Sequence, residues 1–476
     1  MKSNHNLKAQ TKEGVRIPEL LIWGQCLVFA ALYPVWMIYE LLYFRRILLI
    51  SGALLSLYPI YQYRHYFFQK RALPVWLMIG LFAWVLFHLF FLAHDYPAQL
   101  LELRRIWKYA GLGAIFALGL GLSLAGAKII KSKATQGSPY WPLIYFGLCL
   151  PVLIYLLKYL LTTYGPLMGM VVPAYLRINS DGSSAFYIPK TDYIAFCLPV
   201  LALSLGQIYS LLISNFRLRV NQYLSILCYL SMIVATLVLF YVQNTKNGIA
   251  YAAILIAVFL GFIFFKVSSV KFWQKGLLLI VVACGVPTLL YPHLQKNDSW
   301  NTLIADTQIG FQLEKYPQWK YAGEQGYPNN EYGKMVSATN YERAAWLKAG
   351  SQLALNQPLG YGLVEDSFKR LAKGQWPEVS PNLSHSHSGW LDLILGLGFP
   401  GFLCLLLAAL VNIWQSKDLA QPWRSAVFWA LIANLMLWVT TEVAATVSFS
   451  ALLFWISLSC GLTLKDQVQA VKIAKS

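Results

Sequence analysis

Long apolar runs alternate with short polar connections along most of the chain. A helix needs about 20 mostly apolar residues to cross a bilayer, so each such run predicts one membrane-spanning helix. By this criterion the sequence predicts about twelve helices. They cover residues 20–39, 47–63, 73–93, 107–127, 141–161, 193–213, 223–242, 248–265, 276–291, 389–414, 426–445 and 448–464.

One long connection, residues 292–388, interrupts this pattern. It is rich in Trp and Tyr, a composition unlike that of a disordered linker, and we expect it to fold into a cap that contains helices. The chain then divides into an N-terminal transmembrane bundle of about nine helices (1–291), the large loop (292–388), and C-terminal transmembrane helices with a cytoplasmic tail (389–476). The predicted class is an all-α polytopic membrane protein.

Lys and Arg in the short connections predict the orientation, because cytoplasmic loops of membrane proteins are enriched in these residues. The N-terminal segment and every second connection carry several of them, which places both termini in the cytoplasm. The other connections are poorer in charge, although Arg45, Arg46, Arg104 and Arg105 lie in them. The large loop has balanced charges and gives no orientation signal. The short connections therefore determine the orientation, and they place this loop on the side of the membrane opposite the cytoplasm.

Composition supports the same class. The chain is 58% hydrophobic and 12% charged, whereas soluble domains carry about 25% charged residues. The net charge of +18 follows from the basic cytoplasmic connections and requires no nucleic acid partner. A polar, basic N-terminus precedes an apolar run without a cleavage site, which indicates a retained signal anchor. All seven cysteines fall in apolar runs without a CxxC pair, which argues against disulfides and thiolate metal sites.

The stretch SHSHSGWLDLILGLGFPG, residues 384–401, holds two histidines directly before the tenth predicted helix. Ser386 or Ser388 can cap this helix, whose N-terminus suits an anion such as phosphate. His387 could then act as a general base or as a hydrogen-bond donor. The alternative is an interfacial histidine pair that only ends the loop. His385 and His387 supply two ligands, too few for a zinc site.

Two further segments bring basic residues to the same outer side. Residues 340–362 predict a helix on which Arg343 and Trp346 share a face, so the arginine could bind phosphate and the tryptophan could stack on a sugar. The alternative is an amphipathic helix that rests on the bilayer. The turn QNTKNG places Lys246 at the mouth of the bundle, where most lysines merely reach the interface. The loop between the fifth and sixth helices adds Arg177.

Two acidic residues lie near the outer ends of predicted spans, Asp392 and Glu442. Carboxylates are costly in lipid and are usually functional or paired. Asp392 follows Ser388 by four residues, so it could orient His387 or face water in the first turn of the helix.

Several of these residues share the spacing of a known motif. His387-Ser388, nine residues, and Gly398-Phe399-Pro400-Gly401 resemble the motif of the O-antigen ligase family and of the related O-linked oligosaccharyltransferases. The segment from Arg343 to Gly362 is similar to the family's pattern of Arg, a nearby Trp, and Pro-Leu-Gly-x-Gly. Lys246 stands where family members commonly carry arginine, so it keeps the charge but loses the bidentate fork.

The resemblance implies a metal-independent glycosyltransferase without a cofactor, in the inner membrane of a Gram-negative bacterium, with its active site facing the periplasm. It would move a polysaccharide from undecaprenyl diphosphate to the lipid A-core oligosaccharide in lipopolysaccharide biosynthesis. His387 and Arg343 would be catalytic, and Arg343, Lys246 and Arg177 would bind the diphosphate. The possible neighbours of this site are His385, Asp392, Glu442 and Trp346.

Other functions remain open at this stage. An O-linked protein oligosaccharyltransferase would share the donor and the motif, and a polymerase of the lipid-linked chain is less favoured. A transporter is disfavoured because the predicted span centres hold almost no charge, whereas transporters place ionisable residues near the midplane.

Overall fold

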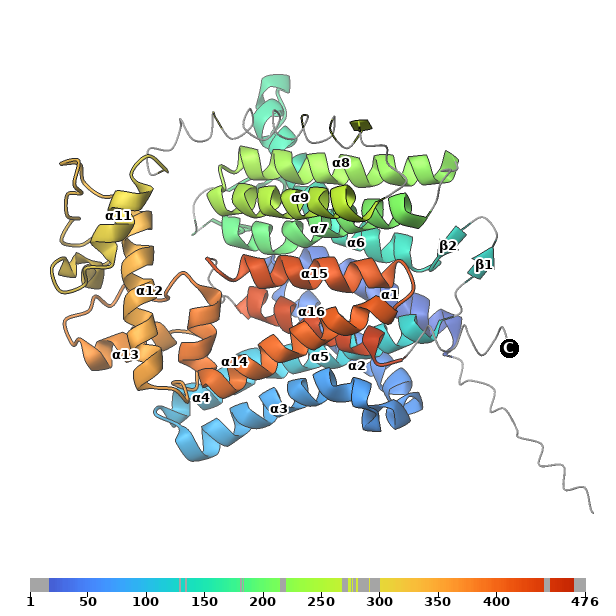
Figure 1. Ribbon diagram of the computed structural model, residues 1–476, viewed down its shortest axis with the longest axis horizontal. Coiled ribbons are helices and arrows are strands. Elements are labelled where there is room, and N and C mark those ends of the chain that lie inside the picture. The colour runs from blue at the N-terminus through green and yellow to red at the C-terminus, as the bar shows by residue number, and fades with distance from the viewer. Residues whose placement is uncertain are drawn as a thin grey trace, which may run out of the picture.

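The apolar runs fold into helices that lie side by side, and the connection before the last three of them forms a cap at one end of this bundle (Figure 1). The computed structural model describes residues 17–127, 130–132, 135–179, 182, 184–214, 220–267, 273–274, 276, 280, 291, 300–440 and 446–465.

Within these residues, eight helical segments are long and apolar enough to cross a membrane, and three shorter apolar helices accompany them. This confirms the all-α polytopic class. The expected span at 276–291 lies mostly outside the described residues. The bundle consists of α1 (Glu19–Val35), α2 (Leu42–Gln62), α3 (Leu73–Phe87), α4 (Tyr96–Glu102), α5 (Lys108–Gly126), α6 (Trp141–Tyr164), α7 (Lys190–Ser214), α8 (Val220–Val242), α9 (Lys246–Lys266), α14 (Gly389–Gln415), α15 (Trp423–Leu437) and α16 (Thr446–Thr463).

Short elements complete the bundle. At the end opposite the cap, β1 (Ile130–Ser132) pairs with β2 (Thr135–Gly137) in an antiparallel hairpin. Two π-helical turns, η4 (His88–Leu92) and η5 (Leu103–Trp107), extend α3 and join α4 to α5. Single 3-10 turns cover Tyr39–Leu41, Arg64–Phe68, Lys70–Ala72, Pro166–Met168, Ala174–Leu176, Pro317–Tyr321 and Ser416–Asp418.

Two helix boundaries differ from the sequence prediction. The fourth span begins at Tyr96 and not at residue 107, because the charged residues Arg104 and Arg105 end the apolar run without ending the helix. The helix α15 ends at Leu437, well before residue 445. Its last carbonyl accepts a hydrogen bond from the Tyr251 hydroxyl of α9, 3.0 Å away, and the chain turns there.

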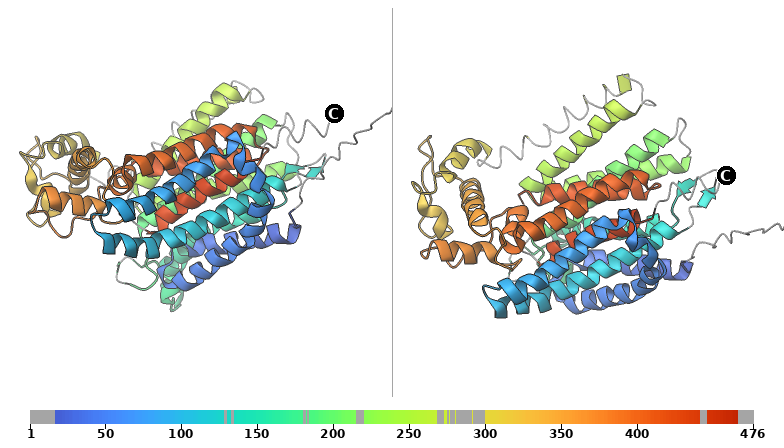
Figure 2. Two further views of the ribbon diagram at one scale, coloured as in Figure 1. Left: turned by 90° about the horizontal axis from the view of Figure 1, so that it is seen from below. Right: turned by 60° about the horizontal axis from the view of Figure 1, so that its bottom comes forward.

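The cap, residues 300–388, contains α11 (Leu303–Gly310), α12 (Ala338–Asn356) and α13 (Ser367–Gln375). Its position beyond one end of the bundle is clear in both views of Figure 2. It has a hydrophobic core of its own, built around Trp319, Tyr341 and Phe368. Leu391 and Leu395 of α14 belong to the same core, so the cap is seated on the first turns of that helix.

A kink in α14 forms the seam between cap and bundle. Gly398 has non-helical backbone angles (φ 67°, ψ 176°), and Pro400 offers no N–H to the carbonyl of Gly396 four residues earlier. The cap segment after α12 replaces the missing bonds. The N–H groups of Tyr361 and Gly362 each donate to α14 carbonyls at 2.8 Å, and Phe399 donates to the carbonyl of Pro358 at 2.9 Å.

Glycines make this seam possible. A Cβ atom on Gly360, whose φ is +79°, would lie 2.3 Å from the backbone nitrogen of Gly398. Conversely, a Cβ atom on Gly398 would lie 2.4 Å from the carbonyl of Leu359. The seam therefore explains both the Pro-Leu-Gly-x-Gly segment and the first glycine of the histidine motif, because each glycine lets the other backbone approach.

We expect Gly360→Ala to lower the free energy of unfolding by about 2–4 kcal/mol, because the new methyl group meets backbone at a left-handed residue. Thermal unfolding of the purified protein in detergent measures this loss. Gly374→Ala is the control, since a Cβ atom there meets nothing within 4 Å. Equal melting temperatures for Gly360→Ala and the wild type would contradict the seam.

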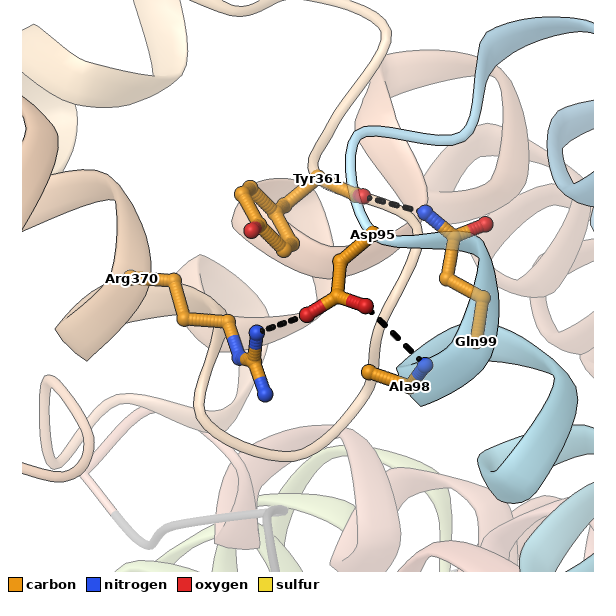
Figure 3. A network of polar contacts seen from close by, with 5 residues as sticks. All are labelled: Asp95, Ala98, Gln99, Tyr361 and Arg370. Atoms are coloured by element: carbon orange, nitrogen blue, oxygen red, sulfur yellow. Dashed lines mark hydrogen bonds and ion pairs between the residues drawn. The ribbon is translucent and has the colours of Figure 1, made fainter.

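A polar clamp holds the other side of the cap to α4 (Figure 3). Asp95 pairs with Arg370 of α13 at 2.6 Å, and the Gln99 amide donates to the carbonyl of Tyr361 at 2.9 Å. The backbone N–H of Ala98 and the Arg370 guanidinium hold the pKa of Asp95 below its usual value. Because this pKa is depressed on folding, the clamp stabilises the protein at neutral pH and weakens as the pH falls through that pKa.

Candidate functional site

A cavity of about 290 Å³ lies where the cap meets the ends of α9, α14 and α15. Five segments that are distant from one another in the sequence contribute to its wall. Three of the basic residues predicted from the sequence line it together: Lys246, Arg343 and His387.

The first wall is the N-terminus of α9. Lys246 and Asn247 are its first two residues, so the unpaired N–H groups and the positive dipole end of a 21-residue helix meet the cavity. The Asn247 amide donates to the carbonyl of Thr440 at 3.3 Å, and its oxygen accepts from the Arg343 guanidinium at 3.4 Å. Asn247 therefore ties α9 to the end of α15 and to the cap.

The second wall is the first half of α12, which carries Asn340 and Arg343. Buried Asp306 of α11 fixes its start, because its carboxylate accepts from the backbone N–H of Ser337 and from the amide of Asn340, both at 3.1 Å. The helix begins at Ala338, so Asn340 lies in its first turn. This arrangement points the half-buried Arg343 side chain into the cavity.

The third wall is the loop before α14, residues Ser386, His387 and Ser388. His387 adopts a left-handed backbone (φ 57°), which is unfavourable for a residue with a Cβ atom by about 1–3 kcal/mol. Such strain persists only where the surroundings impose it, and it is common at functional sites. Ser388 is the residue that precedes α14, although its side chain makes no capping bond.

Buried Asp392 imposes this loop conformation. Its carboxylate accepts from the backbone N–H of Ser386 at 2.9 Å, while its own N–H donates to the carbonyl of Ser388 at the same distance. The carboxylate therefore closes a short loop around His387. Of the two roles considered from the sequence, facing water is excluded by the 4% exposure of Asp392, and its carboxylate contacts the backbone next to the histidine.

Trp346 and His385 flank the imidazole of His387. The Trp346 ring stacks on it at 5.2 Å with an interplanar angle of 15°, and the indole nitrogen donates to the carbonyl of Trp319 at 3.1 Å. The His385 ring meets it edge-on at 4.5 Å, and His385 Nδ1 lies 2.7 Å from the Ser384 hydroxyl. Trp346 is buried in the cap core, so it positions the histidine ring from behind the cavity wall.

Two predicted site residues are not placed at the cavity. Arg177 is exposed in the connection before α7 and is not among the residues that line this cavity. Glu442 lies outside the described residues. The sequence analysis also missed residues that do line the cavity, among them Asn247, Trp300 and Thr440. Asn247 could have been predicted, because it directly follows Lys246 in the QNTKNG turn.

The cavity is suited to an anion. It combines two basic side chains with helix N-termini, and none of its described lining residues is acidic. Within the described ranges, no three His, Cys, Asp or Glu side chains converge as metal ligands would. A phosphate group at Lys246 and Arg343 would lie in the same cavity as the imidazole of His387.

Comparison with known families agrees with this geometry. Residues 230–406 match the family model described as O-antigen ligase. The matched segment runs from the middle of α8 into the second half of α14, so it contains Lys246, Arg343, His387 and the seam at Gly398. Members of this family are glycosyltransferase-like enzymes that act on lipid-linked glycans. No curated protein matched the chain.

Proposed function

We propose that this protein, a membrane-embedded member of the O-antigen ligase family, transfers a polysaccharide from undecaprenyl diphosphate to the lipid A-core oligosaccharide. One observation carries the proposal: two cations and one histidine from three separate segments line a single cavity without a described acid. This set matches what the transfer requires, a leaving diphosphate and an acceptor hydroxyl that must lose a proton.

Lys246 and Arg343 would bind the diphosphate of the donor. Breaking the bond between the anomeric carbon and the phosphate oxygen leaves both bonding electrons on that oxygen. Cations already in place stabilise this developing charge and lower the barrier. The N-terminal N–H groups of α9 add to the same field.

His387 would activate the acceptor. Its imidazole accepts the proton of the sugar hydroxyl as the oxygen attacks the anomeric carbon, so the new glycosidic bond forms while the bond to phosphate breaks. A single displacement of this kind inverts the anomeric centre. No metal ion or cofactor takes part in this scheme.

The proposed reaction sets the orientation of the protein. The donor is used on the periplasmic face of the inner membrane, so the cap and the cavity would face the periplasm. The basic short connections at the opposite end would then face the cytoplasm, together with both termini.

Transfer by purified protein in liposomes tests the proposal. Undecaprenyl-diphosphate-linked glycan is supplied with lipid A-core, with a Ser-rich periplasmic protein or with no second acceptor, and each reaction is repeated with a chelator. We expect a glycan ladder on lipid A-core in both conditions. A glycoprotein product would indicate an oligosaccharyltransferase, longer lipid-linked chains would indicate a polymerase, and either result would overturn the ligase assignment.

The lysine in place of the family's arginine gives a separate prediction. Lys246→Arg should retain transfer to within about threefold, because the charge at the start of α9 is kept. Lys246→Ala should lower the rate at least tenfold, roughly the effect of one charge-assisted hydrogen bond. Initial rates at a fixed donor concentration measure both variants. Complete loss in Lys246→Arg would show that the ammonium group has a role beyond its charge.

A further inference from the structure

Four basic residues at the cap end of the bundle are not used by the proposed reaction. Arg46 lies on α2, and Arg104, Arg105 and Lys108 follow one another along η5 and the start of α5. We call these four residues the outer basic patch. Loops on this side of the membrane are usually poor in Lys and Arg, so their presence here calls for a physical reason.

The four side chains form one cluster. The Arg46 guanidinium carbon lies 4.6 Å from the ring centre of Tyr109, and the Lys108 ammonium lies 4.9 Å from the same ring. Arg104 and Arg105 precede Lys108 by one helical turn, so they extend the cluster along the same side of the helix. Arg104, Arg105 and Lys108 are all exposed.

No ion pair among the described residues offsets the charge of the patch. The two acidic residues that precede Arg104 in the same segment, Asp95 and Glu102, contact the cap instead. Asp95 pairs with Arg370, and buried Glu102 accepts from the backbone N–H groups of Val364 and Glu365 at 2.8–3.0 Å.

The patch lies at the level of lipid headgroups. The span Tyr96–Gly126 has 31 residues, whereas about 20 suffice to cross the hydrocarbon. Asp95 and Glu102 contact the cap, so the excess length is at the cap end, and Lys108 lies 18 residues before Gly126. This spacing puts the patch at the membrane surface.

An apolar groove begins directly below the patch. It has a volume of about 800 Å³ and follows one side of α5 from Gly111 and Ala114 to Leu118, together with residues of α3 and α16. It continues to Ile60 of α2 and the 3-10 turn Arg64–Phe68, toward the end of the bundle opposite the cap. Gly111 is three residues after Lys108, which puts the patch and the groove on the same side of α5. Cations above an apolar groove complement a lipid with an anionic head.

We infer that the outer basic patch binds the phosphate groups of the acceptor, a glycolipid with more than one phosphate, while an acyl chain occupies the groove. This inference rests on the proposed function, which requires such an acceptor in the same membrane leaflet. Four cations exceed the single charge of most glycerophospholipids, which favours a multiply phosphorylated head. The glycan of the acceptor would reach from the patch along the cap to the cavity, since the cap contacts Asp95 and Glu102 beside the patch and also lines the cavity.

Steady-state transfer with the Arg104→Gln/Arg105→Gln variant tests the inference. We expect the KM for lipid A-core to rise roughly 10- to 30-fold, because each removed cation weakens attraction to anionic headgroups. The KM for the lipid-linked donor and kcat at saturating acceptor should stay unchanged. Arg104→Lys/Arg105→Lys should restore the acceptor KM, and Ala114→Phe, which fills the groove, should raise it. The Lys70→Gln/Lys266→Gln variant removes two exposed cations from the opposite end as the matched control.

Native mass spectrometry of the donor-free protein separates the two proposals. We expect the wild type to retain bisphosphorylated lipid A in preference to dephosphorylated lipid A and to phosphatidylglycerol, and we expect the Gln variant to lose this preference. Lipid binding that depends on the patch, without glycan transfer, would support the inference about the patch and reject the proposed function. Transfer with an unchanged acceptor KM in the Gln variant, or equal retention of phosphatidylglycerol, would overturn the inference.

Discussion

His387→Asn should lower the rate of glycan transfer by about 100-fold or more, because a positioned general base contributes roughly 10²- to 10⁴-fold. Asparagine is the best replacement, since it tolerates the left-handed backbone of this residue better than alanine does. The cap core and the cavity walls should therefore survive. Initial rates at saturating donor and acceptor measure the effect, and immunoblotting of membranes checks that the protein accumulates.

His385→Asn is the matched control, because His385 is adjacent in sequence and touches the edge of the His387 ring without lining the cavity. We expect its rate to stay within a few-fold of wild type, since it acts only through its neighbour. A His387→Asn protein with nearly wild-type activity would remove the histidine from the proposed mechanism. Equal losses in both variants would point to the loop as a unit and not to one base.

Arg343→Ala should lower kcat/KM by about 100- to 1,000-fold, the usual effect of removing one preorganised group that stabilises transition-state charge. It should also weaken the binding of undecaprenyl diphosphate, the product that carries the charge. Arg343→Lys should recover part of both losses, because a lysine keeps the charge but not the planar fork. Initial rates and product inhibition by undecaprenyl diphosphate give the two readouts.

Lys348→Ala tests whether any cation of α12 would have the same effect. Lys348 lies on the same helix, donates to the carbonyl of Phe311 at 2.7 Å, and is exposed outside the cavity. Its removal should change the rate by less than about threefold, as is usual for surface substitutions. If Lys348→Ala and Arg343→Ala lose activity equally, the helix and not the guanidinium is what the reaction requires.

Hydropathy predicted the bundle well, because helices in a bilayer must be apolar over a fixed length. The expected runs correspond to eleven helices in the described residues, eight long and three short. Helix boundaries were less predictable where a helix continues beyond the end of its apolar run. Arg104 and Arg105 end the apolar run, yet the helix continues through them to Tyr96 because the cap satisfies the polar groups of that segment.

The candidate site was predictable in its residues but not in its construction. Topology alone brings Lys246, Arg343 and His387 to one end of the bundle, and the cavity that they line is a property of the folded cap. Trp346 was expected to meet a sugar or the membrane, and it lies instead in the cap core behind His387. The close contact between Gly360 and Gly398 could not be predicted from one sequence, since neither segment indicates which other segment it packs against.

The seam at Gly398 also constrains how the protein can move. The cap supplies backbone hydrogen bonds that α14 lacks at its kink, so lifting the cap from this helix would leave polar backbone groups unpaired at the membrane surface. The cap and α14 should therefore move together as one rigid body, which contains both Arg343 and His387. A bulky lipid-linked glycan can then enter only if α9 and the end of α15, which form the opposite wall of the cavity, move away from the cap.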